Sequence, residues 1–223
     1  MSEQKKLSTI PLFSVVFTLA STGIIKIILE VLLSDLHYGS YTGNLIYLLL
    51  LSSTCGIIPV VIYAFTSPPL SALLYKKEEK RSGAAASLIA IAAGTAICIA
   101  ANIIITKLTA LIPGVIYQRG NMNFEAPAVF ILELIVYAAA PAFSEELLFR
   151  GCMLNSLRVY GSIPAILISS IAFSTVHIGV IPIMAYSFAA VIVLSFLRLK
   201  TGRLSVVVLI HFAANLIALF LPV

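Results

Sequence analysis

The stretch APAVFILELIVYAAAPAFSEELLFR, residues 126–150, decides the fold of this chain. It is apolar over most of its length, and about 20 such residues are enough for a helix to cross the hydrocarbon core of a membrane. Three carboxylates interrupt it, those of Glu133, Glu145 and Glu146. Ionisable groups are costly in hydrocarbon unless they are paired or hydrated. The stretch therefore predicts a membrane helix whose few polar side chains need a specific explanation.

The rest of the chain has the same character. Of its 223 residues, 61% are hydrophobic and 10% are charged, which excludes a disordered chain and an ordinary cytosolic enzyme. Windows of about 19 residues predict seven membrane spans, at residues 7–33, 44–66, 84–106, 126–150, 163–180, 183–199 and 204–222. We therefore expect an all-α fold, a polytopic transmembrane bundle of about seven helices. It forms a single integral membrane domain over residues 1–223, with a motif-bearing core over residues 126–222.

The basic residues predict how the chain is oriented in the membrane. With the N-terminus placed inside, eleven of the 14 basic residues fall in inner segments, namely Lys5, Lys6, Lys76, Lys77, Lys80, Arg81, Arg150, Arg158, Arg198, Lys200 and Arg203. This asymmetry follows the positive-inside rule. We expect a multi-pass protein of the cell (plasma) membrane with a cytoplasmic N-terminus and the lipid bilayer around it. The net charge of +5 then reflects topology, and no nucleic acid is expected as a partner.

The adjacent carboxylates of Glu145 and Glu146 cannot share one role. Neighbouring residues on a helix point about 100° apart, and Glu146 stands four residues before Arg150, the spacing of an intrahelical ion pair. Glu146 is therefore expected to be held by Arg150, while Glu145 faces elsewhere and is available for chemistry. Pro141 lies one turn before Glu145 and is expected to distort the helix there and open space beside the carboxylate.

Two further carboxylates within predicted spans need a partner. Lys26 and Glu30 stand four residues apart in the first span, which predicts an internal ion pair. Glu133 lies in the outer part of the fourth span, where it either snorkels, bonds a neighbouring helix or lines a route to the site. We interpret both carboxylates as structural.

Two of the three histidines lie inside predicted spans, and both can join Glu145. If the fourth helix continues to Tyr160 and turns at Gly161, Glu145 and His177 are equidistant from the turn and face each other. His211 and Asn215 stand four residues apart on one helix face and project into one cavity. There they could bind a metal, orient a water or donate to an oxyanion. We therefore expect an intramembrane active site in a water-filled pocket of the inner half of the membrane.

These motifs resemble those of the CPBP intramembrane proteases, the group that includes the type II CAAX prenyl endopeptidases and the bacterial Abi-type, bacteriocin-related proteins. The matching motifs, in order on separate helices, are Glu-Glu-x-x-x-Arg (Glu145, Glu146, Arg150), Phe-x-x-x-His (Phe173, His177) and His-x-x-x-Asn (His211, Asn215). Together they extend over about a third of the chain. No motif position departs from the pattern, whereas the first three spans carry no motif of the family.

The resemblance implies an endopeptidase that cleaves a peptide or protein substrate, including a membrane-anchored one. It assigns Glu145 and His177 to activation of the attacking water, and His211 with Asn215 to the tetrahedral oxyanion. Glu145, His177 and His211 also match the ligand set of a zinc hydrolase with an open position for water. A metal-free glutamate mechanism uses the same side chains, so zinc is one of two hypotheses.

Two other classes of function account for the same residues. Carboxylates and histidines inside a membrane also serve proton- or ion-coupled transporters, for which uptake driven by a pH gradient would be the diagnostic measurement. The absence of a visible internal repeat disfavours the inverted-repeat transporters. The second alternative is a catalytically idle immunity or scaffold protein that keeps the fold, against which the intact motif residues weigh.

Overall fold

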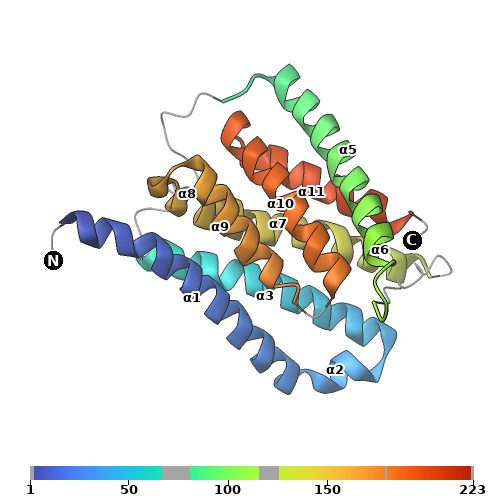
Figure 1. Cartoon of the computed structure of the whole chain (residues 1–223). Coiled ribbons are helices and arrows are strands. Elements are labelled where there is room, and N and C mark those ends of the chain that lie inside the picture. Colours follow the sequence, from blue (N-terminus) through green and yellow to red (C-terminus); the bar gives the residue numbers. More distant parts are fainter. Residues whose placement is uncertain (1–2, 67–80, 116–125, 179, 222–223) are drawn as a thin grey trace.

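The helix that carries the two adjacent glutamates lies at the centre of a bundle of helices (Figure 1). The computed structural model describes residues 3–66, 81–115, 126–178 and 180–221. Within these ranges the secondary structure is helical, with no strand. The predicted all-α fold is confirmed. The basic residues Lys76, Lys77, Lys80 and Arg119, on which part of the orientation rests, lie outside the described residues.

Helices occupy all seven predicted positions. Their bounds are α1 (Glu3–Leu32), α2 (Ser34–Gly39), α3 (Tyr41–Thr66), α5 (Ala84–Thr109), α6 (Pro127–Leu134), α7 (Ala140–Glu146), α8 (Leu154–Leu157), α9 (Ser162–Thr175), α10 (Ile181–Thr201) and α11 (Leu204–Leu219). Two π-helical segments, Ile135–Ala139 and Leu147–Met153, join α6 to α7 and α7 to α8, and a 3₁₀ turn over Arg158–Tyr160 follows α8. The segment from α6 to this turn is therefore one continuous helix, which we call the long helix.

Four described segments are long and apolar enough to cross a membrane. They are Tyr41–Val61, Ala84–Thr109, Pro127–Tyr160 and Ile181–Thr201. The helices α9, with 14 residues, and α11, with 16, are apolar but shorter. The predicted span 163–180 is too long at its end, because residues 176–178 form a turn and α10 begins at Ile181. The lengths and composition of the helices are those of an integral membrane protein.

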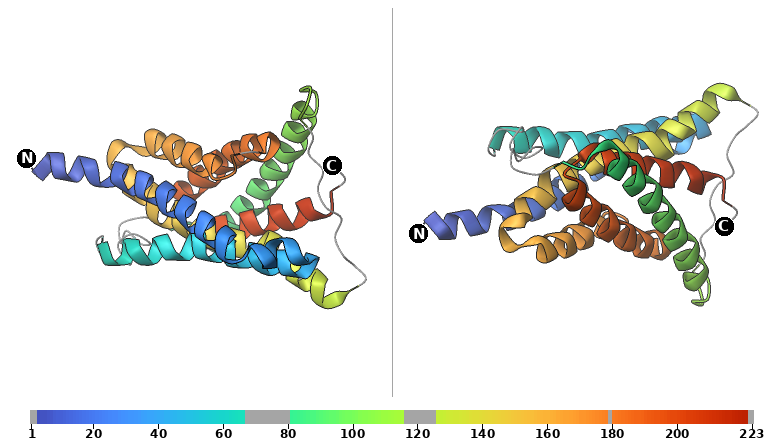
Figure 2. Two further views of the ribbon diagram at one scale, coloured as in Figure 1. Left: turned by 90° about the horizontal axis from the view of Figure 1, so that it is seen from below. Right: turned by 90° about the horizontal axis from the view of Figure 1, so that it is seen from above.

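The long helix and α11 lie between two groups of helices. On one side α3 packs against α7, and α1 packs against α3. On the other side α10 packs against α5, α9 and α11, and α11 also contacts α5 and α7 (Figure 2). This arrangement places side chains of α7, α9 and α11 around a shared interior.

The long helix has a wider backbone turn immediately before Pro141. The amide of Ala140 donates to the carbonyl of Ile135, five residues earlier, in place of the usual four. Proline has no amide hydrogen, and its ring crowds the preceding helical turn. The distortion expected around Pro141 thus takes the form of a π-type turn, a feature often found at functional sites.

A glycine allows α3 to approach α7 closely beside the two glutamates. A Cβ atom added at Gly56 would overlap Ser144, the residue before Glu145. The hydroxyl oxygens of Ser52 and Ser144 lie 3.4 Å apart at the same contact. Small residues let membrane helices pack closely, so this contact fixes the position of α7 against α3.

The turn between the long helix and α9 lies where the sequence predicts it. Gly161 has a φ of 101°, a conformation that glycine adopts without the steric penalty of other residues. Behind the turn, buried apolar side chains of the two segments pack together, among them Leu154, Leu157 and Ala165. The expected hairpin is confirmed.

The predicted ion pair between Lys26 and Glu30 is wrong. Within the described residues no ion pair joins them, and Lys26 is exposed. Glu30 accepts hydrogen bonds from the hydroxyls of Tyr47, at 2.5 Å, and Tyr38, at 2.7 Å, and lies 3.0 Å from the imidazole of His37. The short helix α2 turns the chain back toward α1, so these donors satisfy the carboxylate that the sequence assigned to the lysine.

Candidate active site

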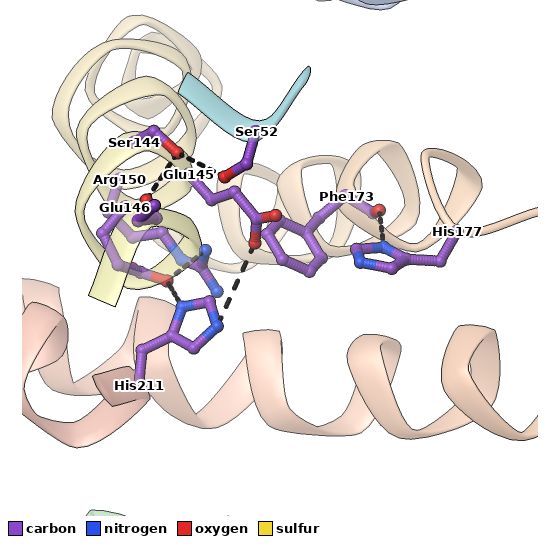
Figure 3. A network of polar contacts seen from close by, with 9 residues as sticks. Ser52, Ser144, Glu145, Glu146, Arg150, Phe173, His177 and His211 are labelled. Carbon is purple, nitrogen blue, oxygen red and sulfur yellow. Dashed lines mark hydrogen bonds and ion pairs between the residues drawn. The ribbon is translucent and has the colours of Figure 1, made fainter. Parts of the chain in front are cut away.

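The carboxylate of Glu146 contacts two side chains inside the bundle (Figure 3). Its Oε1 atom lies 2.7 Å from Nη1 of Arg150, and both side chains are completely buried. The same oxygen lies 2.8 Å from Nδ1 of His211. The predicted pairing of Glu146 with Arg150 is confirmed, and the contact with His211 adds a partner from α11 that helical spacing did not show.

The guanidinium of Arg150 is enclosed but poorly hydrogen-bonded within the described part of the chain. Its contact with Glu146 is close, yet none of its three nitrogens has a hydrogen bond of good geometry, and Oε2 of Glu146 has none either. The guanidinium carbon lies 4.8 Å from the centre of the Phe173 ring, a cation–π contact. A buried ion pair offsets the cost of its desolvation only when its geometry is good. We therefore interpret the pair of Glu146 and Arg150 as a means of positioning His211 rather than as a source of stability.

Glu145 faces a different environment from its neighbour. Its side chain is 25% exposed, whereas that of Glu146 is fully buried. Its Oε2 atom lies 4.0 Å from Nε2 of His211. His211 therefore stands between the two carboxylates, one at each ring nitrogen, and the predicted division between a held and an available glutamate is confirmed.

The structure does not bring Glu145 and His177 into contact. In the described chain no hydrogen bond or ion pair joins them, and the ring of Phe173 lies between their side chains in Figure 3. Nδ1 of His177 lies 3.2 Å from the carbonyl of Phe173, four residues earlier. The direct meeting that the hairpin register predicted is wrong, because α9 ends at Thr175 and His177 folds back onto the last turn of that helix.

A cavity of about 500 Å³ nevertheless unites the predicted residues. Glu145, His177, His211 and Asn215 all line it, together with Pro141. The expectation that His211 and Asn215 project into one cavity is confirmed. Glu146 and Arg150 lie behind the cavity lining. Glu146 is connected to the cavity through its contact with His211.

The sequence analysis missed part of the cavity lining. Glu133, interpreted as structural, lines the cavity and accepts a hydrogen bond from the hydroxyl of Tyr41. Tyr137, Asn102 and Thr106 line it as well. The polar residues of α5 carried a weak signal, since an asparagine and a threonine one turn apart are uncommon in so apolar a helix.

The donors of the zinc hypothesis do not converge. Among the described residues, no group of three or more His, Cys, Asp or Glu side chains is placed to hold a metal ion. Glu145 and His211 approach each other, but His177 lies beyond the Phe173 ring. This arrangement does not fit a three-ligand metal site. Zinc stays a hypothesis for metal analysis to test.

The fold and site define a class of protein: a helical membrane protein whose interior carries the carboxylate, imidazole and amide groups of a hydrolase. Residues 127–217 match the model of the family described as Type II CAAX prenyl endopeptidase Rce1-like, so this part of the chain is similar to that family. The match includes every motif residue from Glu145 to Asn215. No curated protein and no solved structure matches the chain.

Proposed function

We propose that this protein hydrolyses a peptide bond of a protein or peptide substrate inside the membrane, with Glu145 as the general base. One observation carries the proposal: Oε2 of Glu145 and Nε2 of His211 lie 4.0 Å apart beside the cavity, while Nδ1 of His211 contacts the buried Glu146. The match to a protease family supports the reaction class. The site supplies a base, an imidazole and an amide donor where a substrate can enter.

The contact with Glu146 sets the tautomer of His211. A carboxylate paired with Arg150 is an acceptor, so the neutral imidazole donates its Nδ1 hydrogen to it. The Nε2 atom then carries the lone pair and faces Glu145. Glu146 and Arg150 thus act as positioning residues for His211.

The gap between Glu145 and His211 suits one water molecule. Hydrogen bonds from a water to oxygen or nitrogen acceptors are about 2.8 Å long, so a water that donates to both atoms bridges a 4.0 Å separation at a favourable angle. The geometry therefore favours His211, rather than His177, as the partner of Glu145 in holding the nucleophile. Glu145 takes one proton as the water oxygen attacks the carbonyl carbon.

The remaining cavity residues suit the later steps of the reaction. The carbonyl electron pair moves to oxygen, where the amide hydrogens of Asn215 and the imidazole of His177 are the available donors. Glu145 then returns its proton to the leaving amine nitrogen as the carbon–nitrogen bond breaks. The electron pair on the oxyanion re-forms the carbonyl bond, and the second proton of the water stays on the oxygen that becomes part of the carboxyl product.

We propose the orientation that the basic residues favour: a cytoplasmic N-terminus in the cell (plasma) membrane. Single cysteines at Ser82 and Leu111, near opposite ends of α5, report on it in a background in which Cys55, Cys98 and Cys152 are serine. A membrane-impermeant maleimide applied to intact cells should label position 111 and not position 82. The reverse labelling would overturn the orientation.

The endopeptidase is tested with the purified full chain in lipid nanodiscs and a library of internally quenched peptides. Cleavage by the natural sequence should fall about 100-fold or more in Glu145→Gln, since general-base catalysis supplies that factor. Unchanged turnover in this variant would overturn the assignment. Metal analysis of the active preparation, with and without chelator, decides whether a metal is needed.

A further inference from the structure

The cavity has a second polar end that the reaction does not use. It is formed by side chains of the long helix, α3 and α5, namely Tyr41, Asn102, Thr106, Glu133 and Tyr137, which we call the Glu133 end. Glu133 itself is completely buried, and the hydroxyl of Tyr41 donates a hydrogen bond to it. A buried carboxylate, two phenols, an amide and a hydroxyl thus line the same cavity as Glu145.

The π-type turn explains why Glu133 and Glu145 share a cavity. Twelve residues of regular α-helix rotate by about 120° net, which would place the two side chains on different faces. The wider turn at Ile135–Ala139 absorbs one additional residue, and the remaining rotation leaves them about 20° apart. At about 1.5 Å per residue, the two carboxylates are separated by about 18 Å along the helix axis.

Apart from its two histidines, the cavity is lined by acidic rather than basic side chains. Over the described parts of its lining, the cavity has the carboxylates of Glu133 and Glu145 and no lysine or arginine. Arg150, the basic residue nearest the site, lies behind the lining and pairs with Glu146. Charges interact strongly where water is scarce, so the cavity favours a cationic group of a ligand.

We propose that the Glu133 end binds a lysine or arginine side chain of the substrate, an inference that rests on the proposed endopeptidase. An ammonium or guanidinium group donates hydrogen bonds, which the Glu133 carboxylate and the oxygens of Asn102 and Thr106 accept. The rings of Tyr41 and Tyr137 offer cation–π contacts to the same group. An extended peptide advances about 3.3 Å per residue, so the cationic residue lies about five positions from the cleaved bond.

Binding of defined peptides tests this subsite without the need for cleavage. The probes are fluorescent 14-residue peptides with a single lysine and no other charged residue. The lysine stands at a different position in each peptide, and a matched peptide carries norleucine at the same position. Fluorescence anisotropy is measured with full-length Glu145→Gln protein in nanodiscs. We expect lysine to bind about tenfold more tightly than norleucine at its best position. Equal binding at every position would overturn the proposal.

Two matched variants locate the effect at Glu133. In the Glu145→Gln background, Glu133→Gln keeps the shape of the side chain and removes its charge, so the preference for lysine should fall to about onefold. Tyr41→Phe removes the hydrogen bond to Glu133 but keeps the charge, so the preference should persist. A lysine preference that Glu133→Gln leaves intact would contradict the assignment. The comparison of lysine with norleucine peptides needs neither of these two variants. The subsite can therefore be tested even if Glu133→Gln or Tyr41→Phe does not fold.

Cleavage of the same peptides by the natural sequence separates the two proposals. Cleavage without a preference for lysine would refute the subsite and leave the endopeptidase standing. A lysine preference that depends on Glu133, without cleavage of any peptide, would refute the endopeptidase and leave the cationic site in place.

Discussion

Within the described residues, two places join a glutamate to a histidine, and one of them opens onto the cavity. Glu30 and His37 lie 3.0 Å apart where α1, α2 and α3 meet, and Glu146 and His211 lie 2.8 Å apart in the bundle interior. The first carboxylate is surrounded by tyrosine hydroxyls, and the imidazole of His37 stacks on the rings of Tyr38 and Tyr47. Every group of this first cluster is engaged with another member.

The second pair differs in what lies beyond the imidazole. The other ring nitrogen of His211 faces Glu145 across a gap and opens onto the cavity. Glu146 is buried and held by Arg150, whereas Glu30 is partly exposed. The comparison teaches that a carboxylate–imidazole contact is a common structural device. Catalysis requires in addition a second base and space for the substrate.

The largest expected effect separates Glu145 from Glu30. Glu145→Gln should lower kcat for a cleaved peptide by about 100- to 10,000-fold, because it removes the general base. Glu30→Gln, at the other glutamate–histidine contact, should leave kcat within a few-fold. Steady-state cleavage by both purified variants checks this, with circular dichroism to confirm the helical fold. An equal loss in both variants would remove the distinction between the two regions.

The two histidines of the cavity should differ in their effect on the pH profile. His211→Gln keeps a hydrogen-bond donor but loses the lone pair that orients the water, so kcat should fall about 100-fold. His177→Gln should retain more activity, and steady-state cleavage by the two variants across a range of pH measures the difference. If His177→Gln is instead the more damaging variant, Glu145 and His177 hold the water as the family resemblance implied.

Arg150 tests whether the buried pair serves the site or the fold. Arg150→Met leaves Glu146 buried without its cation and should lower the free energy of unfolding by about 3–5 kcal/mol. The double variant Glu146→Leu and Arg150→Met should recover much of that stability, yet cleavage should stay low because His211 loses its acceptor. Unfolding in mixed detergent micelles measures the stability. Full activity of the stable double variant would show that His211 needs no carboxylate at Nδ1.

The smallest effect is expected at His37. His37→Phe keeps the aromatic stacking on Tyr38 and Tyr47 and removes one of the three donors to Glu30. The midpoint of thermal unfolding should shift less than in Arg150→Met, since His37 and Glu30 are partly exposed and two hydroxyl donors remain. Loss of cleavage in this variant would show that the first cluster is coupled to the cavity.

Local spacing was sufficient to predict much of the site. The ion pair of Glu146 and Arg150 and the shared face of His211 and Asn215 depend only on the four-residue repeat of a helix, which the structure keeps. The turn at Gly161 was readable because glycine and a following proline mark such positions. These features depend on neighbours in the sequence.

Features that depend on irregular backbone or on another helix were not predictable in this way. The facing of Glu145 and His177 assumed that α9 runs past residue 177, whereas it ends at Thr175. The partners of Glu30 come from α2 and α3, beyond the reach of helical spacing. The place of Glu133 in the cavity depends on the one additional residue in the turn before Pro141, whereas the proline predicted only that the helix is distorted there.

The wider turn at Ile135–Ala139 also affects how this chain should be compared with others. Because the turn contains one residue more than an α-helical turn, a related chain that is one residue shorter there can present the same two carboxylates on one face. An alignment gap of one position within this segment is therefore compatible with an unchanged arrangement in space. A gap of the same size within Ala140–Glu146 would instead rotate the glutamates away from His211.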